Sequence, residues 1–504
     1  MSISRREFIA SSATVTVAAA VASGLPRIAY TAAASDPDVI VIGAGLSGLE
    51  TALTLEENGV KVLMLEGRRR IGGRVYSLFN VPGHPEVGGN TIANAYGRMI
   101  AAGAKYGVEI VNIAPRLFKN PIPQELFLSG EHIALKDWPA HKKNPFVGAQ
   151  RALPPWAWAD ALIKQNMPFK DLENWYDPKY AQYDISMHEF FTKLGASEEQ
   201  IRLGFDTNIG YGTTSYDVSL LMQAFSDYWQ AVNRGMLMAF SRTGAVSAPP
   251  ATGAPPAMPL IGVFKGGNQN LPIAMAAKVK GPLLQGKRVV AIDVDDNGAS
   301  VTCEDGSQYK AKAVVCTMPF STLRHVAINP MPPATQARAI KTLGVIPITQ
   351  IHIVPKKPFW KEDGMGPGMW SDGPLGIVLA QKFGKTDDEI TSLAVWARGL
   401  NALYVDRFGA DTGKAIVREF ERLRPAAKGQ LEVAAVHSWT LDPFSGGDWA
   451  IYQPGQVTAF ANLLSKPHKR LFFAGEHTSI GSRGMEGALE SAERVSLETM
   501  TAIG

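Results

Sequence analysis

Hydrophobic and polar positions near the start of the sequence follow a strand–helix–strand order. Residues 38–43 are an almost continuous apolar run, typical of a strand that is buried on both faces. Residues 49–58 carry apolar side chains at helical spacing, and Gly59 follows as the expected helix end. Residues 60–66 form a second apolar run, which ends in an acidic residue. The pattern predicts a βαβ unit and an α/β fold.

The turn between the first strand and the helix carries a G-x-G-x-x-G motif made by Gly43, Gly45 and Gly48. In a Rossmann-like unit the first glycine permits a tight turn, the second lets the backbone approach a pyrophosphate, and the third packs helix against strand. The helix N-terminus directs free N–H groups at the phosphates. Glu66 ends the second strand, where it can accept a hydrogen bond from a ribose hydroxyl. The unit therefore predicts a dinucleotide-binding site.

The residues after Glu66 distinguish between the possible dinucleotides. They read Gly67-Arg68-Arg-Arg-Ile-Gly-Gly73-Arg74, which resembles the extended E-x-R-x-R-x-G-G-R signature of the large FAD oxidoreductases. The glycine pair lets a second backbone segment run close under the cofactor, and Arg68 and Arg74 can meet phosphate charge. We therefore expect FAD rather than NAD.

Four further segments extend this resemblance over nearly all of residues 36–504. The sequence resembles the flavin-containing amine oxidase family, which includes monoamine oxidase, polyamine oxidase and L-amino-acid oxidase. In that family the matching segments run along the flavin ring, return the chain to the FAD domain, contact the adenine and bind the flavin from the C-terminal side. The matching segments are Glu86-Val-Gly-Gly89-Asn90, Val263–Asn268, Arg288–Pro319 with Val289 at the adenine, and Leu471–Thr478 with Gly475 and Glu476, followed by Gly484–Ala488 with Met485.

The order of these segments predicts a discontinuous architecture. A Rossmann-like FAD-binding domain is expected from residues 36–115, 260–330 and 440–504. The resemblance implies that residues 116–259 and 331–439 form an interleaved α+β substrate-binding domain. Aromatic residues are concentrated in the first of these inserts; we expect most of them in the core and one or two in the wall of an apolar substrate tunnel: Trp156, Trp158, Trp175, Tyr176, Tyr211 and Trp229.

Flavin chemistry needs few protein groups. The simplest route for an amine is hydride transfer to flavin N5, which gives an imine that water hydrolyses to a carbonyl. No metal is required, and the histidines show no ligand spacing. An apolar pocket favours the neutral amine, because desolvation lowers the pKa of an amine. We expect His437 and His477 to be hydrogen-bonded structural residues rather than bases.

The strip that ends in Gly446-Gly447-Asp448-Trp449 matches one wall of the aromatic cage that the family places over the flavin. The resemblance makes Trp449 this wall, where its ring can orient the substrate nitrogen. The second wall corresponds to Gly484, so the cage is expected to be half open. Members with covalently bound flavin carry a cysteine where this chain has Asp448, so the resemblance implies non-covalent FAD.

A second departure from the family concerns the electron acceptor. Oxygen-reactive members usually keep a lysine that holds a water near N5, and alignment places Gln350 or Thr349 there. Loss of the cation should slow the reaction with oxygen. We therefore expect a dehydrogenase that passes electrons to a periplasmic carrier such as a cytochrome c, with oxygen as the alternative. Bacterial nicotine-degrading members behave in this way, and the chain resembles them in its N-terminus and its cage tryptophan.

Three other functions remain open at the level of sequence. L-amino-acid oxidases need an arginine for the substrate carboxylate, often just after the Glu-x-Gly-Gly strip. Residues 90–94 contain none, and Arg98 is the nearest. This favours an amine substrate over an amino acid, while FAD-dependent desaturation and a non-catalytic flavin-binding protein are further alternatives.

The N-terminus and the composition bear on location. Arg5 and Arg6, with Phe8, precede a short apolar stretch at 12–22 and a run of alanines, which together predict a twin-arginine signal peptide over residues 1–34 and a periplasmic enzyme. No apolar run is long enough to span a membrane. The net charge of +4 is too small to indicate a nucleic-acid partner. The two cysteines, in strand-like runs, are expected to be buried thiols.

Overall fold

Two of the apolar runs, β1 (Val39–Ile42) and β2 (Val62–Glu66), lie side by side as parallel strands. The odd-numbered side chains of β1 belong to one buried cluster and the even-numbered side chains to another, because side chains alternate along a strand. The strand is therefore buried on both faces, as its continuous apolar pattern predicts.

The structure is a computed structural model that describes residues 37–167, 174–229 and 260–504. The predicted signal peptide, residues 1–34, lies outside the described residues. The described residues from 37 onward belong to one compact unit. The division into an FAD-binding and a substrate-binding domain therefore stays a prediction, although the two halves contain different sheets.

β1 and β2 are the centre of a five-stranded sheet in which every neighbouring pair is parallel. Its strands come from all three segments that the sequence assigns to FAD binding, so residues far apart in the chain share one sheet. The order is β10 (Leu283–Gln285), β2, β1, β14 (Ala313–Cys316) and β23 (Leu471–Phe473).

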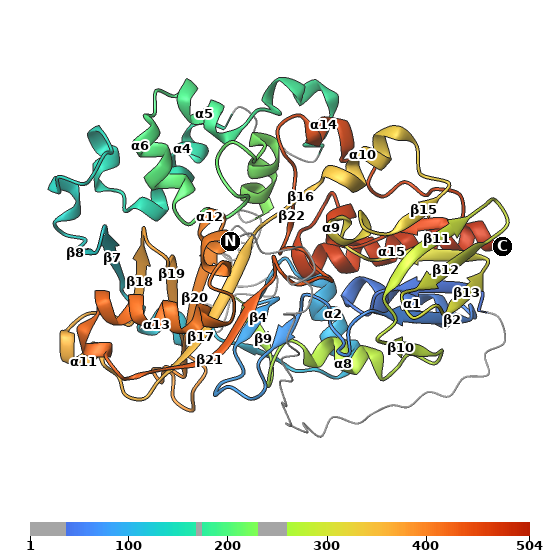
Figure 1. Cartoon of the computed structure of the whole chain (residues 1–504), viewed down its shortest axis with the longest axis horizontal. Helices are drawn as coiled ribbons and strands as arrows, with labels where there is room; N and C mark the ends of the chain where they lie inside the picture. The colour runs from blue at the N-terminus through green and yellow to red at the C-terminus, as the bar shows by residue number, and fades with distance from the viewer. Residues whose placement is uncertain (1–36, 168–173, 230–259) are drawn as a thin grey trace, which may run out of the picture. The chain divides into compact units, whose positions relative to one another are not determined.

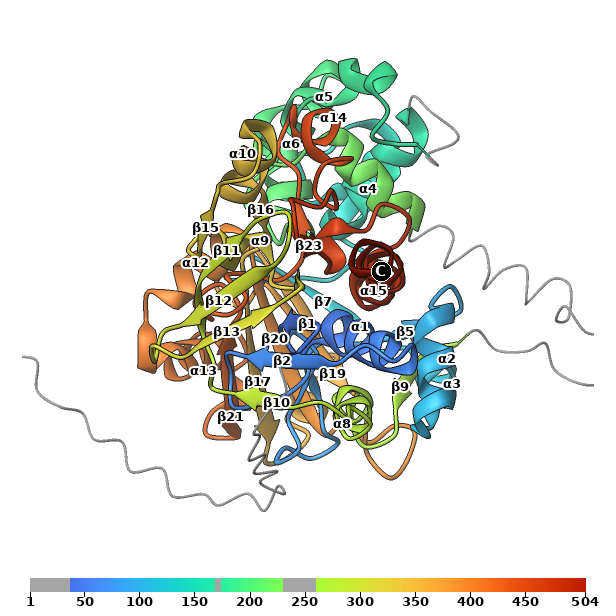
Figure 2. The same cartoon turned by 90° about the vertical axis from the view of Figure 1, so that its right-hand side faces the viewer.

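Different layers cover the two faces of this parallel sheet. The helices on one face pack with the odd-numbered side chains of β1; Figure 2 shows α15 end-on next to α1. A four-stranded sheet packs with the even-numbered side chains on the other face. The helices are α1 (Leu46–Glu57), α8 (Asn270–Ala276) and α15 (Gly484–Ile503), and the covering strands are β11 (Val289–Val294), β12 (Ala299–Cys303), β13 (Gln308–Ala311) and β15 (Ala327–Asn329).

Helix α1 begins earlier than the sequence pattern predicts. The apolar spacing predicts a start at residue 49, whereas the helix begins at Leu46 directly after Gly45. The two small residues in its first turn, Ser47 and Gly48, add no side-chain signal to the apolar pattern but are buried against neighbouring elements. Consequently the N-terminus of the helix, rather than a loop, lies next to the glycine turn.

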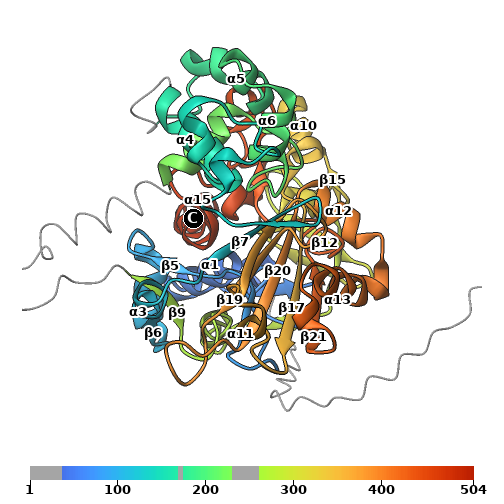
Figure 3. The ribbon, with the colours of Figure 1, turned by 90° about the vertical axis from the view of Figure 1, so that its left-hand side faces the viewer.

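A seven-stranded sheet is built from the intervening parts of the chain. All its neighbouring pairs are antiparallel except β18 and β7. Helices α12 (Leu400–Asp406) and α13 (Thr412–Leu423) contribute to the core against it, and Figure 3 shows the strands with these helices alongside. The order is β21 (Leu431–Ser438), β17 (Ile348–Pro355), β20 (Ser392–Arg398), β19 (Ile377–Gln381), β18 (Gly368–Ser371), β7 (Gln124–Leu128) and β8 (Glu131–Ile133).

Smaller elements connect these layers, as Figure 1 shows. A helical group shares a buried cluster with β7, β8 and β18: α4 (Pro155–Asn166), α5 (Met187–Lys193) and α6 (Glu198–Ile201). Short pairings hold the connecting segments: β3 (Tyr76–Ser77) with β4 (Glu86–Gly88), β16 (Gly344–Val345) with β22 (Ala450–Ile451), and β5 (Ile92–Ala93) and β6 (Ile110–Asn112) with β9 (Ile261–Phe264). Further helices are α2 (Gly97–Tyr106), α9 (Phe320–Leu323), α10 (Ala334–Thr342) and α14 (Gln456–Phe460).

Two expectations concern the described chain as a whole. Cys303 and Cys316 are both free and buried, which confirms the prediction of two buried thiols. Within the described ranges, none of the helices combines the length and the apolar character that a membrane crossing requires.

Candidate functional site

A groove opens at the carboxyl ends of the parallel strands. β1, β2, β14 and β23 each deliver a lining residue just beyond or at their last position: Gly43, Glu66, Thr317 and Gly475. Ligands of open α/β sheets bind at this edge. The groove is therefore where the fold itself predicts a cofactor.

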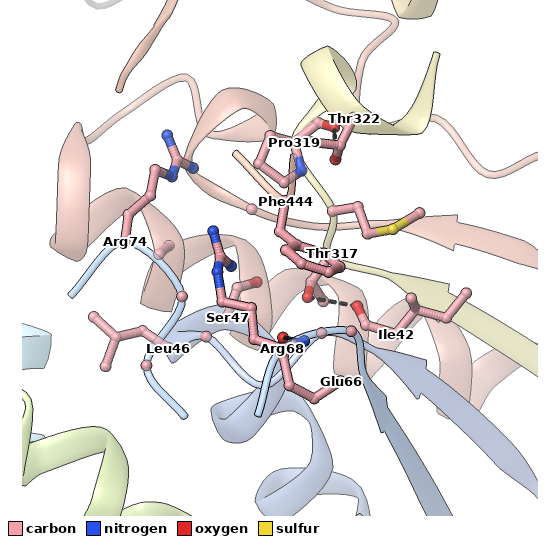
Figure 4. A pocket seen from close by; sticks show the side chains of 18 of the residues that line it. Ile42, Leu46, Ser47, Glu66, Arg68, Arg74, Thr317, Pro319, Thr322 and Phe444 are labelled. Atoms are coloured by element: carbon pink, nitrogen blue, oxygen red, sulfur yellow. Dashed lines mark hydrogen bonds between the residues drawn. The ribbon is translucent and has the colours of Figure 1, made fainter. Parts of the chain in front are cut away.

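Most of the site residues predicted from the sequence line this one groove. They come from five separated segments. Figure 4 shows Glu66, Arg68 and Arg74 at the pocket, together with Thr317 and Phe444 from later parts of the chain. Gly48, Asn90, Thr349 and Gln350 are not part of its wall. The predicted residues in the wall are Gly43, Gly45, Glu66, Arg68, Gly73, Arg74, Gly89, Val289, Trp449, Gly475, Glu476 and Met485.

The glycines keep the floor of the groove free of side chains. Gly43 has φ +106°, and a Cβ there would lie 2.5 Å from Thr317 Oγ1. A Cβ on Gly48 would lie 1.9 Å from the carbonyl oxygen of Gly43, so helix and turn touch directly. Gly45 ends the turn as the N-cap of α1 without a side-chain cap. The N–H groups of the first helical turn are thus left for a phosphate.

Glu66 is buried at the end of β2 and is held by the backbone. Its Oε2 accepts a hydrogen bond from the Ala44 N–H at 2.7 Å, and its Oε1 accepts one from the Arg68 N–H at 2.7 Å. The carboxylate therefore ties the glycine turn to the second strand. Since a carboxylate oxygen has more than one lone pair, the group can also accept a hydroxyl donor from the groove.

The two predicted phosphate-binding arginines both have carboxylate partners. The Arg68 guanidinium donates to Asp442 and to Ser445 Oγ, each at 2.7 Å. Arg74 donates to Glu476 Oε1 at 2.8 Å and to the carbonyl oxygen of Asp448. These pairs join the first segment of the chain to the last, and they neutralise part of the charge expected to face a phosphate.

Two carboxyl groups in the wall of the groove, those of Glu476 and Asp448, differ in pKa. Burial opposes ionisation of Glu476, but Arg74 and His477 outweigh it and hold the pKa of that carboxyl below its usual range. Burial raises the pKa of Asp448 to about 6, despite the opposing charge of Arg74. One acid is thus ionised at neutral pH, whereas the other titrates just below it.

The histidines near the groove behave as neutral side chains. Burial lowers the pKa values of both His437 and His477 to about 4. The prediction that both are hydrogen-bonded is wrong for His477, because neither of its ring nitrogens has a hydrogen-bond partner among the described residues, and it is not borne out for His437, whose Nε2 has none there either and lies 3.8 Å from Asp442 Oδ2. Its ring instead packs edge-on against Phe320 at 4.5 Å.

The predicted cage wall stands next to Tyr211, one of the aromatic residues that the sequence assigns to the core or to the wall of a substrate tunnel. Trp449 lines the groove, and a Cβ on Gly484 would lie 3.2 Å from its ring. Tyr211 lies nearly parallel to Trp449, with the ring centroids 6.1 Å apart and the planes inclined by 29°. The Arg483 guanidinium lies over both rings, 5.0 Å from the Trp449 centroid and 5.3 Å from the Tyr211 centroid.

The two alternatives for the lysine position point to opposite sides of β17. Thr349 is buried and donates to Asp406 on α12 at 2.6 Å. Gln350 pairs in register with Trp396 and His437, and its Oε1 lies 3.2 Å from His352 Nε2. Because neither residue lines the groove, their role beside the flavin stays a prediction.

Asn90 and Gly89 are held at the edge of the groove by a buried asparagine. Asn268 Nδ2 donates to the carbonyl oxygens of Gly89 and Asn90, at 2.5 and 3.1 Å. Asn90 Nδ2 donates to the carbonyl oxygen of Glu86 at 3.3 Å. Asn90 therefore holds the segment Glu86–Asn90 in place and does not line the groove. Gly89 faces Met485: a Cβ added to Gly89 would lie 3.0 Å from Met485 Sδ.

Sequence reasoning missed the groove residue Thr317 and the arginines beside the cage, Arg398 and Arg483. Thr317 Oγ1 donates to the Ile42 carbonyl at 2.7 Å, a bond drawn in Figure 4. Its position directly after a buried strand is a signal that could have found it. The arginines carry no local signal, because only the fold brings residues 211, 398 and 483 together.

The described residues fit FAD on structural grounds. The floor of the groove is glycine, and one end carries the uncapped N-terminus of α1. The other end reaches Trp449 and the start of α15 at Gly484. Within the described ranges, no cluster of His, Cys, Asp and Glu could hold a metal ion.

Comparison with known proteins extends this picture. A family model described as flavin containing amine oxidoreductase matches residues 46–498. The chain is 25% identical to an amine oxidase [flavin-containing] of Danio rerio, over 93% of this chain and 86% of that protein. It is also 25% identical to a pseudooxynicotine dehydrogenase of Pseudomonas sp, over 98% of this chain and 95% of that protein.

Solved structures show the same fold. A cyclohexylamine oxidase of Brevibacterium oxydans superimposes with a TM-score of 0.69 at 23% identity, over 93% of this chain and 99% of the other. A wild-type putrescine oxidase bound to putrescine gives a TM-score of 0.67 at 20% identity, over 93% and 99%. The mixed α/β architecture predicted from the sequence is confirmed.

Proposed function

The chain belongs to the flavin-containing amine oxidoreductase family and is an FAD-dependent enzyme of amine oxidation, and from this premise we propose that it converts an amine to an imine that water hydrolyses to a carbonyl. FAD, when bound, supplies a hydride acceptor at its N5 atom. The observation that carries the proposal is the position of Trp449 in the same groove as the glycine turn.

The protein's own contribution is to position a neutral amine. The Trp449 ring presents a negative face to the substrate nitrogen, and Tyr211 extends the aromatic wall on the other side of the cage. Both rings are only partly exposed. An apolar wall excludes water and favours the amine form that can give up a hydride, because desolvation lowers the pKa of the amine.

We propose that FAD is held without a covalent bond and that its electrons pass to a periplasmic carrier such as a cytochrome c, with oxygen as the slower acceptor. Asp448 stands at the position of the cysteine that bonds the flavin in covalent members. The lysine position is taken by Gln350 or Thr349, both neutral and buried. A neutral group gives developing superoxide less stabilisation than a cation does.

One experiment tests the reaction and the acceptor in two stages. The oxidised enzyme is mixed without oxygen with a panel of primary and cyclic amines, amino acids and polyenes, and the flavin absorbance is followed. We expect bleaching by amines and release of a carbonyl product. Bleaching by polyenes alone would indicate desaturation, and no bleaching at all would indicate a binding protein.

Air is then admitted to the reduced enzyme, with and without cytochrome c. We expect slow reoxidation by air and fast reoxidation by the cytochrome. Fast reoxidation in air alone would overturn the carrier proposal while leaving amine oxidation intact. Precipitation with acid should release all of the yellow colour into the supernatant if the flavin is non-covalent.

We also propose export through the twin-arginine route, on the basis of residues 1–34. The twin-arginine machinery exports folded proteins, so FAD would be loaded before export. Changing Arg5 and Arg6 together to lysine should leave flavin-loaded enzyme in the cytoplasm, whereas the wild type should fractionate with the periplasm. Equal distribution of both forms would contradict the proposal. Changing the nearby Arg27 to lysine provides the matched control.

A further inference from the structure

Two arginine side chains flank the aromatic cage, and their surroundings differ. Arg483 is buried, with 4% of its surface exposed, and its guanidinium is engaged. It donates to Ser226 Oγ at 2.6 Å and to the Ala450 carbonyl at 3.3 Å, while it lies over the two cage rings. Its role is to hold the cage walls, so it has little capacity left for a ligand.

Arg398 does not line the groove itself, and its guanidinium has no such partners among the described residues. It is half-buried at the end of β20, and its guanidinium stacks over the Trp396 ring, 4.7 Å from the centroid. Across residues 37–167, 174–229 and 260–504, no ion pair or hydrogen bond engages its guanidinium. A stacked, planar cation with free donors is the form in which proteins present arginine to a carboxylate.

The backbone places Arg398 within reach of the cage. Arg398 pairs in register with Ile348 at the start of β17. Two residues before Ile348, in the connection between β16 and β17, the Ile346 N–H donates a hydrogen bond of 3.0 Å to the Trp449 carbonyl oxygen. Arg398 and the cage tryptophan therefore flank one short stretch of chain.

The neighbouring residue places Arg398 beside the second cage ring as well. Gly399 has φ +56°, and an added Cβ would lie 2.4 Å from Ile209 and 2.8 Å from the Thr213 carbonyl oxygen. The end of β20 thus packs directly on the loop that carries Tyr211. In agreement with this, Tyr211 and Asp448 both favour a higher pKa of Arg398, although burial has the larger effect and lowers that pKa.

The charges around the cage leave a positive excess. Glu476 already pairs with Arg74, and Asp448 makes no ion pair within the described part of the chain. Burial keeps the pKa of Asp448 near 6, so its charge balances only one of the two arginines even when it is ionised. A ligand with a negatively charged group would neutralise the remaining positive charge beside the cage.

This inference rests on the proposed amine oxidation: we propose that Arg398 is a specificity-determining residue that binds the carboxylate of the substrate, so that the preferred substrates are amines that also carry a carboxylate. The sequence places no arginine after the Glu-x-Gly-Gly strip, and Arg98 instead pairs with Glu486 and Glu493. Arg398 supplies the missing charge from a different element, the end of β20.

The test compares acids with their amides. The anaerobic rate of flavin bleaching is measured with L-leucine and L-leucinamide, 4-aminobutanoate and 4-aminobutanamide, and 6-aminohexanoate and 6-aminohexanamide. We expect the wild type to prefer one acid over its amide by about 10- to 100-fold in the ratio of reduction rate to dissociation constant. The pair that shows the preference gives the distance between amine and carboxylate.

Three variants assign the preference to the side chain. Arg398→Met should erase the preference for the acid, and Arg398→Lys should restore part of it. Arg418→Met, at an exposed arginine of α13, is the matched control and should behave as the wild type. The visible flavin spectrum reports whether each variant still folds around FAD.

The outcomes separate the two levels of the proposal. If simple amines bleach the flavin but no acid exceeds its amide, or if the preference survives in Arg398→Met, the role of Arg398 is overturned and amine oxidation stands. If no amine, acid or amide bleaches the flavin, amine oxidation itself is wrong and the inference falls with it.

Discussion

Asp448 is a single carboxyl group whose charge depends on pH near neutrality. It lines the groove directly before Trp449, and burial raises its pKa from an ordinary value of 3.8 to about 6. Between these two values the unfolded chain has lost the proton while the folded protein keeps it. Folding is therefore stabilised by this group below pH 4, and the stabilisation is lost as the pH rises through 6.

The predicted effect is a difference between the wild type and Asp448→Asn. From pH 4 to pH 7 the free energy of unfolding of the wild type should fall relative to the variant by at most about 3 kcal/mol. Thermal unfolding at half-unit pH steps measures this difference. A constant difference across the range would show that the group is ionised in the folded protein throughout. Asp387→Asn, at an exposed loop position, is the control.

At the scale of elements, the contact between α1 and the glycine turn makes a sharp prediction. Gly48→Val places a Cβ within 1.9 Å of the Gly43 carbonyl oxygen, so the helix must move away from the turn. We expect a loss of about 3 kcal/mol in stability and purified protein with less than a tenth of the normal flavin content. Gly97→Val is the control at the start of α2, where no atom lies within 4 Å of an added Cβ. It should keep the normal stability and the normal flavin content.

Elements also show which features the sequence could predict. The strands β1 and β2 and the glycine turn were predicted because apolar period and motif are local signals. The start of α1 was misplaced because Ser47 and Gly48, in its first turn, add no apolar side chain to the helical pattern. Tyr211, Arg398 and Arg483 were not assigned to the cage, because their proximity comes from β20, a loop and α15 packing together in space.

At the scale of the whole chain, the sequence indicates that residues 36–74 and 471–487 fold onto each other, and the described part of both stretches does so. β23 belongs to the same parallel sheet as β1, and α15 packs against α1. The Arg74–Glu476 ion pair and the hydrogen bond between Ser47 Oγ and Ser491 Oγ, at 3.1 Å, join the same parts of the chain. FAD would thus contact both ends of the described chain at once.

Removal of FAD should therefore increase local unfolding in residues 43–74 and 471–487 at the same time. A ligand that binds only the folded protein stabilises it by about 4 kcal/mol when its concentration is 1,000 times the dissociation constant. We expect the apoprotein to have a lower Tm, and hydrogen exchange to rise in parallel at 43–74 and 471–487, while β18 and β19 stay protected because neither strand contributes a groove residue. Added FAD should reverse both changes. Faster exchange in one stretch alone would show that the two ends bind the cofactor independently.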